Sequence, residues 1–400
     1  MAEEYCYPIE RKTLSDYYEM VWRCAKCGYC RNVFPSDTEQ EEFGRQCPPG
    51  DYFKFESYFA SGRNEITRQV IDGNLGMTER LRHILYTCTT CGHCEEWCHA
   101  TQGLYPLKTI MALREHFVQN DGEILPEHKK IEESIEKNHN RLNRNNRDRT
   151  AWLTEGKITK AEEADILYFV GCRSSFRRTE IAKNTYELLT DKLGLKVGLI
   201  EDERCCGRPL IDIGKEEEAF KLIKHNVDKI SASGVKMVLF SCAECFHTFN
   251  SIEKFGMPKE FEAIHLSQFI DSQIKEGKLS LGSKKKNIAF HDPCYLGRHE
   301  GEYEAPRAIL SSIKDATVVE LPRNRKNAWC CGSGGGVHEA FGEYSQWIAM
   351  ERMEEVNFVK ADTVVTSCPG CKGNLWGPCK ANDVEIMDLA ELVNQTAEVK

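Results

Sequence analysis

The spacing of the cysteines constrains this chain more than any other feature of its sequence. Twenty of the 400 residues are cysteine, far above the usage of an ordinary long chain. All but Cys6 and Cys379 fall into four blocks, which are Cys24, Cys27, Cys30 and Cys47; Cys88, Cys91, Cys94 and Cys98; Cys172, Cys205, Cys206, Cys242 and Cys245; and Cys294, Cys330, Cys331, Cys368 and Cys371. We expect Cys6 to be incidental and Cys379 to be a buried spectator.

The rest of the sequence favours metal over disulfides as the role of these cysteines. The N-terminus is acidic with no apolar core behind it, so we expect no signal peptide and a cytoplasmic, reducing location. No apolar run approaches the roughly 18 residues of a spanning helix, so any membrane association must come through a partner subunit. The net charge of −9 argues against nucleic acid as a partner, and an apolar fraction of 41% excludes wholesale disorder.

The first two blocks match iron–sulfur sequences. The second block has the spacing of a bacterial ferredoxin run, with His99 in place of the usual proline. Each iron of a cubane [4Fe–4S] cluster takes one thiolate, and in two-cluster ferredoxins the fourth cysteine of each run serves the other cluster. The spacing therefore predicts two cubane sites, one at Cys24, Cys27, Cys30 and Cys98 and one at Cys88, Cys91, Cys94 and Cys47. Structural zinc is the alternative, but a third cysteine at the same interval, twice, favours iron.

The last two blocks form an internal repeat of about 125 residues. Each contains an adjacent cysteine pair followed by glycine, Gly207 in the first copy and Gly332 in the second. Short apolar, β-branched runs precede the cysteines at residues 165–170, 235–240, 287–290 and 363–366, with helical patterns between them. This alternation predicts two α/β units with mainly parallel sheets, whose cysteines lie where open α/β sheets bind ligands.

The adjacent pair carries chemical information of its own. Neighbouring side chains do not easily bind one metal in tetrahedral geometry, but they can bind two irons of one cluster. The glycine after each pair permits close approach of the backbone and unusual dihedral angles. Five thiolates in each unit exceed the four that a cubane takes, so the count alone implies a cluster other than a cubane.

The repeated pattern, from Cys172 to Cys245 and from Cys294 to Cys371, resembles the CCG domains of heterodisulfide reductases. With the ferredoxin-like block in front, residues 15–380 resemble the D-type subunit of that family. The resemblance implies a non-cubane [4Fe–4S] cluster in each unit, between which a disulfide of the coenzyme M–coenzyme B type is cleaved to two thiols. It also implies a multi-subunit complex, with a membrane cytochrome b-type subunit or a soluble flavin/iron–sulfur subunit as partner.

An electron-transfer role without substrate chemistry is the alternative function. Relatives that keep one intact copy of the repeat serve hydroxy-acid dehydrogenases or quinone reductases in this way. Such a chain would link a flavoprotein dehydrogenase or a bifurcating complex to a membrane cytochrome or quinone site. Both copies are complete here, which favours the disulfide reductase.

We expect an α+β multidomain protein. Residues 1–125 would form a mainly helical ferredoxin-like domain, residues 161–275 the first CCG unit and residues 286–395 the second. Residues 126–160 are charged and rich in asparagine and arginine. They could be a solvated linker or a docking surface for an acidic partner, and the solvated linker is the default.

Several other residues are candidates for the site. The ten CCG cysteines are candidate catalytic residues, joined by His291 and His299, which could protonate a leaving thiolate. Basic residues near the cysteines could bind an anionic substrate or balance the negative charge of the clusters. These residues are Arg173, Arg177, Arg178, Arg208, Arg298 and Lys372. The glycine-rich residues 332–336 lack the ending of a phosphate-binding loop and are interpreted as a turn around cluster sulfides. No flavin, nicotinamide or haem motif is present, so such groups would belong to a partner.

Overall fold

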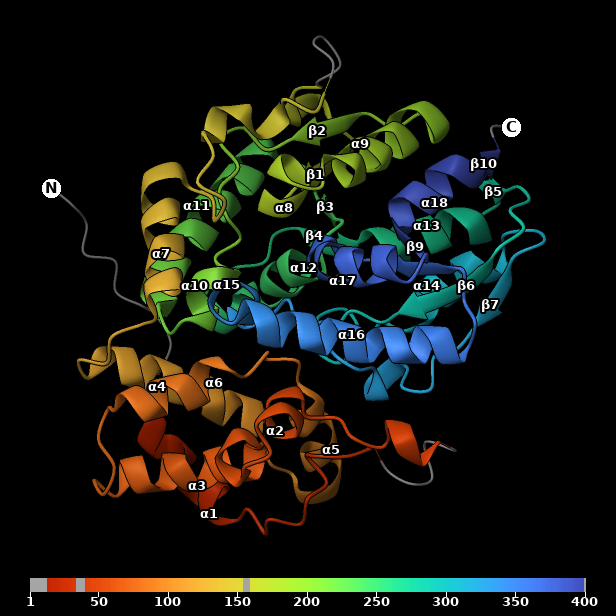
Figure 1. The fold of residues 1–400 in the computed structure, drawn as a ribbon. Coiled ribbons are helices and arrows are strands. Elements are labelled where there is room, and N and C mark those ends of the chain that lie inside the picture. The colour runs from red at the N-terminus through yellow and green to blue at the C-terminus, as the bar shows by residue number, and fades with distance from the viewer. Residues whose placement is uncertain (1–12, 34–39, 154–158, 399–400) are drawn as a thin grey trace, which may run out of the picture.

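The structure is a computed structural model that describes residues 13–33, 40–153 and 159–398, without the side chains of residues 100–102. Cys6 therefore lies outside the described residues. Figure 1 shows a helical N-terminal part on one side of the molecule and two α/β units on the other, with helix α16 along the boundary. The predicted fold class, a helical ferredoxin-like part followed by two α/β repeats, is confirmed.

The N-terminal part contains helices and 3₁₀ turns. Its α-helices are α1 (Tyr18–Trp22), α2 (Pro48–Phe53), α3 (Ala60–Ile71), α4 (Glu79–Tyr86), α5 (His93–Gln102), α6 (Pro106–Gln119) and α7 (Pro126–Asn138). Proline stands in the first turn of α2, α6 and α7, where its missing N–H has no helical partner to lose. Leu85, Leu113 and Phe117 belong to a small core between α3, α4 and α6.

The first α/β unit is a four-stranded parallel sheet in the order β2-β1-β3-β4. Its strands are β1 (Ile166–Phe169), β2 (Val197–Leu199), β3 (Met237–Phe240) and β4 (Glu262–His265). Its helices are α8 (Cys172–Phe176), α9 (Thr179–Glu187), α10 (Arg208–Asp212), α11 (Glu216–Ser233), α12 (Ala243–Asn250) and α13 (Leu266–Lys275). Every residue of β1 is buried, as expected of a strand that helices cover on both faces.

The second unit repeats this arrangement, with the strand order β7-β6-β8-β9 and parallel pairing throughout. Its strands are β6 (Asn287–His291), β7 (Thr317–Val319), β8 (Thr363–Thr366) and β9 (Glu385–Asp388). Its helices are α14 (Glu304–Ser311), α15 (Val337–Ala340), α16 (Gly342–Phe358), α17 (Pro369–Ala381) and α18 (Leu389–Thr396). A short antiparallel pair, β5 (Ser280–Leu281) with β10 (Ala397–Glu398), joins the connector to the C-terminal segment.

The two units share their core. Leu167 of β1 and Val364 of β8 belong to one buried cluster, which also includes Tyr86 of the N-terminal part. Ile166 of β1 and Ile288 of β6 belong to a second cluster on the other side of the sheets. Because the cores are continuous, the cysteine sets of the two units are held in fixed positions relative to one another.

The expectation of a solvated linker after residue 125 is wrong for most of that segment. Residues 126–138 are helix α7, which buries His128, Ile131 and Ile135. Beyond the helix, Asn140 and Arg149 are also buried. The high charge of the segment concealed an amphipathic helix whose few apolar residues recur at helical spacing.

One buried arginine joins the three parts of the chain. Arg114 of α6 is completely buried. Its guanidinium donates to the carbonyl oxygens of Leu85 and Cys88, each at 2.7 Å, and to those of Asp212 at 2.6 Å and Gly335 at 3.2 Å. A buried guanidinium whose donors all find acceptors is a stable arrangement, and here its acceptors come from the N-terminal part and both α/β units.

Candidate iron–sulfur sites

The N-terminal part contains two cavities lined by cysteines. One is lined by Cys24, Cys27, Cys30 and Cys98. The other is lined by Cys47, Cys88, Cys91 and Cys94, and Cys30 lines it as well. The structure thus brings together the members of each predicted cubane set.

Helix α5 explains how two distant runs contribute to both cavities. It begins after Gly92, whose φ of 79° is in the left-handed region that glycine adopts easily. Cys94 in its first turn lines the cavity of its own run, and Cys98 one turn later lines the cavity of the other run. The fourth cysteine of the first run, Cys47, directly precedes α2.

The five cysteines of the first CCG unit line a third cavity. Cys172 and Cys242 follow the carboxyl ends of β1 and β3, and Cys205-Cys206 follow β2. Hydrogen bonds from the thiols of Cys205 and Cys245 lower the pKa of Cys206 to about 5. A thiol that loses its proton this readily is prepared to bind iron as thiolate.

The five cysteines of the second unit form a chain of contacts. Cys330 contacts Cys294 and Cys331, and Cys371 contacts both Cys331 and Cys368. The pKa of Cys331 lies well below that of an ordinary thiol, because the thiols of Cys330 and Cys371 donate hydrogen bonds to it. The structure brings all five together in the second unit, as in the first.

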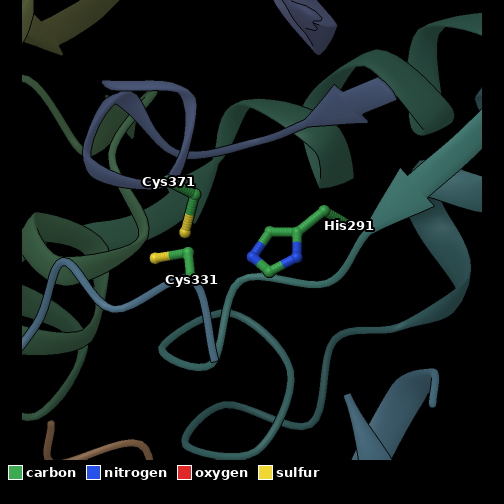
Figure 2. A group of neighbouring side chains, drawn as sticks. All are labelled: His291, Cys331 and Cys371. Carbon is green, nitrogen blue, oxygen red and sulfur yellow. The ribbon is translucent and has the colours of Figure 1, made fainter. Parts of the chain in front are cut away.

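His291 projects from the end of β6 toward Cys331 and Cys371, as Figure 2 shows. Nitrogen and sulfur atoms of the three side chains lie within 4.8 Å of one another. Arg352 Nε donates to His291 Nδ1 at 3.1 Å, so the ring proton is on Nε2, which has no partner among the described residues. Burial, reinforced by the charge of Arg352, lowers the pKa of His291 to about 3 and keeps the ring neutral.

His299 lies in a different environment. Its Nε2 is 3.1 Å from the carbonyl oxygen of Thr90, and its ring stacks on Tyr295 with centroids 4.3 Å apart. It also packs against Gly92 of the ferredoxin-like run. The contacts therefore join His299 to the backbone around the second cubane set and not to the CCG thiols.

Contacts between the sets form a continuous path. The Cys242 thiol of the first unit lies close enough to Cys368 of the second to lower the pKa of Cys368. The Cys91 thiol of the N-terminal part likewise lowers the pKa of Cys330 of the second unit. The thiols of three of the four sets are thus in side-chain contact.

The chemistry of the sites fits iron–sulfur clusters. Buried hydroxyls of Thr89, Ser174, Ser333 and Ser367 have no hydrogen-bond partner among the described residues, although each lies within two positions of a candidate ligand. Unsatisfied buried donors are costly, whereas cluster sulfurs accept hydrogen bonds. The donor sets are all thiol, and sets of five exceed what tetrahedral zinc takes.

Two arginines near the first set were not found from the sequence. Arg149 pairs with Glu203 at 2.7 Å, and its Nη2 lies 3.6 Å from Cys172 Sγ. Arg141 lines the cavity and pairs with Glu339 at 2.5 Å. Both come from the segment predicted to be solvated. The run of arginines was visible in the sequence, but nothing in its spacing indicates which of them is buried.

The basic residues that the sequence did single out have different surroundings. Arg173 lines the cavity and lies 3.5 Å from Glu339, whereas Arg177 is exposed. The others have partners elsewhere: Arg178 over the ring of Trp376, Arg208 with Asp212, Arg298 with the carbonyl of Cys91, and Lys372 with Glu180 and Glu391. Only Arg173 of the predicted set lines the cavity.

The structure explains why a glycine follows each of the two cysteine pairs. Gly207 and Gly332 have φ of 83° and 86°, in the left-handed region. A Cβ at Gly207 would lie 3.0 Å from the carbonyl oxygen of Ala219, and one at Gly332 would lie 2.8 Å from that of Ser345. The predicted unusual dihedral angles are present. The close neighbour is the backbone of α11 in the first unit and of α16 in the second.

Comparison with known proteins gives consistent results. A cysteine-rich domain family matches residues 166–250 and 288–376, and a 4Fe-4S dicluster domain family matches residues 20–101. The chain is 30% identical over 391 residues to the D-type subunit of the dihydromethanophenazine:CoB–CoM heterodisulfide reductase of Methanosarcina acetivorans, covering 93% of each chain. It is 33% identical over 324 residues to that of Methanosarcina barkeri, covering 79% of this chain and 78% of the relative.

A third relative is the B-type subunit of the fumarate reductase (CoM/CoB) of Methanothermobacter marburgensis, 26% identical over 96% of this chain and 75% of the relative. No helix among the described residues has the length and apolar character to span a membrane. The length of the match to the heterodisulfide reductases, together with the 4Fe-4S and cysteine-rich domains, settles the family. The chain belongs to the family of heterodisulfide reductase D-type subunits and is an iron–sulfur oxidoreductase subunit of that type.

Proposed function

We propose that the chain holds two cubane and two non-cubane [4Fe–4S] clusters and reduces a small-molecule disulfide to two thiols. The contact between Cys242 of the first unit and Cys368 of the second carries the proposal, because it places two complete five-cysteine sets side by side. The clusters would supply one-electron transfer. Two adjoining sets can then provide the two electrons that one disulfide bond requires.

The sequence of contacts supports an order for the electrons. The set at Cys24, Cys27, Cys30 and Cys98 is nearest to solvent, since Cys27 is exposed, and it shares Cys30 with the neighbouring cavity. The contact of Cys91 with Cys330 leads from there to the second CCG unit. We infer that electrons from a partner enter at the first run and reach the first CCG unit last.

The reaction needs protons as well as electrons. Cleavage of R–S–S–R′ consumes two electrons, supplied by the partner subunit, and two protons, and releases RSH and R′SH. Of the two predicted proton donors, His291 lies beside Cys331 and Cys371 with an N–H that has no partner among the described residues. His299 is engaged with the carbonyl oxygen of Thr90. The contacts therefore favour His291 as a hydrogen-bond donor to a leaving thiolate. Because its pKa is lowered to about 3 the ring is neutral, so the two protons themselves come from solvent.

Arg141 and Arg173 support an anionic substrate. Both line the cavity of the first set and share Glu339 as their counterion. Burial opposes ionisation of Glu339, but Arg141 and then Arg173 lower its pKa to about 2, so the carboxylate is ionised. Guanidinium groups bind sulfonate, phosphate and carboxylate well, and the names of the relatives suggest the coenzyme M–coenzyme B heterodisulfide as substrate.

The remaining proposals concern the setting of the chain. We propose a cytoplasmic subunit that meets the membrane through a partner, either a cytochrome b-type subunit or a soluble flavin/iron–sulfur subunit. The supporting observation is that the relatives are named as subunits of larger reductases. We also propose domain limits at residues 125, 160, 275 and 286. The buried clusters of the protein extend across these limits, so the parts that they divide are packed together.

The test is viologen-driven reduction of a panel of disulfides, including the coenzyme M–coenzyme B heterodisulfide, by anaerobically purified protein. Iron and acid-labile sulfide are counted on the same sample. We expect one mixed disulfide to be consumed, and the Cys205→Ser plus Cys330→Ser double variant to lose that activity. Unaltered reduction by the double variant would refute the assignment. A full cluster complement without disulfide consumption would favour the electron-transfer role, and a colourless, iron-free protein would indicate zinc.

A further inference from the structure

The backbone of the glycine-rich residues 332–336 is packed against the ferredoxin-like run. A Cβ at Gly334 would lie 2.8 Å from the carbonyl oxygen of Thr89. One at Gly335 would overlap that of Cys88, and one at Gly336 would lie 2.6 Å from His128 Nε2. Contacts this short do not occur for real Cβ atoms, so no side chain fits on the facing surface.

Two buried side chains, Arg114 and His128, hold this contact in place. Arg114 donates to the carbonyl oxygens of Gly335 and Cys88, at 3.2 and 2.7 Å, so one buried guanidinium holds both backbones. His128 of α7 lies 3.0 Å from the carbonyl oxygen of Gly336. These hydrogen bonds hold the backbone of the loop against its neighbours at a separation that only glycine permits.

The two backbones that meet here are those that carry cluster ligands. Cys88 and Cys91 belong to the second cubane set, and Cys330 and Cys331 to the second CCG unit. A second contact joins the same two ligand-bearing segments, because Arg298 donates to the carbonyl oxygens of Cys91 at 2.7 Å and Ala328 at 2.6 Å.

We propose that Gly334, Gly335 and Gly336 set the separation between the cysteine set at Cys47, Cys88, Cys91 and Cys94 and the set of the second CCG unit. They thereby set the rate at which an electron passes between the two. Electron transfer through protein slows steeply with distance, and an atom inserted into a close-packed contact forces the backbones on its two sides to shift. The proposal rests on the proposed cluster occupancy, but it does not depend on the identity of the substrate or on disulfide reduction.

Gly334→Ala is the sharpest test, because the φ of Gly334 lies outside the left-handed region and alanine adds only the clash with Thr89. At Gly335, whose φ is 66°, alanine would add backbone strain. The matched control is Gly342→Ala, eight residues further on, where a Cβ meets nothing within 4 Å. Each holoprotein is first assayed for iron and sulfide, which reports directly whether the proposed clusters are present.

One electron is then delivered by flash photoreduction with a deazaflavin radical, with no disulfide present, and its passage between the clusters is followed by absorbance. Pulsed EPR of partly reduced samples measures the magnetic interaction between them. We expect Gly334→Ala to keep its clusters, to transfer the electron several-fold more slowly and to show a weaker interaction, with Gly342→Ala unchanged. A full cluster content with unchanged rate and interaction in Gly334→Ala would overturn the proposal.

If Gly334→Ala fails to assemble its clusters, His128→Gln tests the same loop without inserting an atom. The variant disturbs the contact of His128 with the carbonyl of Gly336, and we expect a smaller slowing of transfer and a smaller loss of interaction. Unchanged values there would overturn the proposal. Wild-type protein that lacks the clusters of the second unit would instead refute the proposed function, and the iron count reveals this before any flash.

Discussion

The two CCG units have equivalent strand orders and the same order of cysteines, yet their thiols face different neighbours. The set of the first unit lines a cavity together with Arg141 and Arg173. The set of the second unit contacts the ferredoxin-like run through Cys330 and Cys91. Two units with equivalent sheets and the same number of cysteines can therefore have different roles in electron transfer and substrate binding. The difference in their surroundings arises from segments outside the repeat.

The ends of the first strands show the same divergence. His291 ends β6 in the second unit, whereas Phe169 ends β1 in the first. Phe169 packs against Phe240 and Phe249 in the core, but His291 presents an N–H without a partner among the described residues, beside two thiols. We infer that the second unit receives electrons and offers a hydrogen-bond donor, while the first unit faces the cavity proposed for the substrate.

The largest effect should come from removing one cysteine of each unit. We expect Cys206→Ser and Cys331→Ser each to lose the cluster of their own unit and to abolish disulfide reduction. Electron transfer from the ferredoxin-like part into a CCG unit should survive in Cys206→Ser and stop in Cys331→Ser. Mössbauer spectra of photoreduced samples distinguish the two, and loss of transfer in Cys206→Ser alone would reverse the roles of the units.

The sequence sufficed for the repeat and for the grouping of the cysteines because both depend on local spacing. Short apolar runs before Cys172, Cys242, Cys294 and Cys368 are strands, and the structure gathers the cysteines at their ends. The contribution of Arg141 and Arg149 could not be predicted, since burial of one arginine among several depends on segments far away in the chain. The packing partner of the glycine-rich loop could not be predicted for the same reason: its neighbour is a backbone more than two hundred residues earlier.

A buried ion pair gives the next prediction. Arg149 and Glu203 are 2.7 Å apart, and Glu203 also accepts from the backbone N–H groups of Val170 and Gly171, just before Cys172. We expect Arg149→Met to lower the free energy of unfolding by about 3–5 kcal/mol, because it leaves a buried carboxylate unpaired. Iron should be lost from the first unit before the second. Arg147→Met, at an exposed position nearby, should leave denaturant unfolding and iron content unchanged, and equal loss from both units would contradict the local role.

A smaller effect is expected at the cavity itself. Arg141→Gln should raise KM for an anionic disulfide about tenfold, which corresponds to about 1.4 kcal/mol and to the loss of one hydrogen bond from a charged group. Arg173 remains to bind the substrate, so kcat should change little. The matched control is Arg144→Gln, since Arg144 is exposed. An uncharged disulfide should show no change in KM, and an equal rise for both substrates would mean that Arg141 only supports the fold.

The smallest effect tests whether the two units have equal ligand sets at all. Cys379 lies on α17 two turns after Cys371, and the position that corresponds to it in the first unit is Glu253. Its side chain is fully buried, its Sγ lies 3.5 Å from Met353 Sδ, and burial raises its pKa to about 12, so it stays a neutral thiol.

We expect Cys379→Ala to cost about 1 kcal/mol of stability through the small cavity it leaves, with iron, sulfide and activity retained. Cys371→Ala, in contrast, should lose the cluster of the second unit. Loss of iron in Cys379→Ala would give the second unit a sixth ligand and end the equivalence of the two sets.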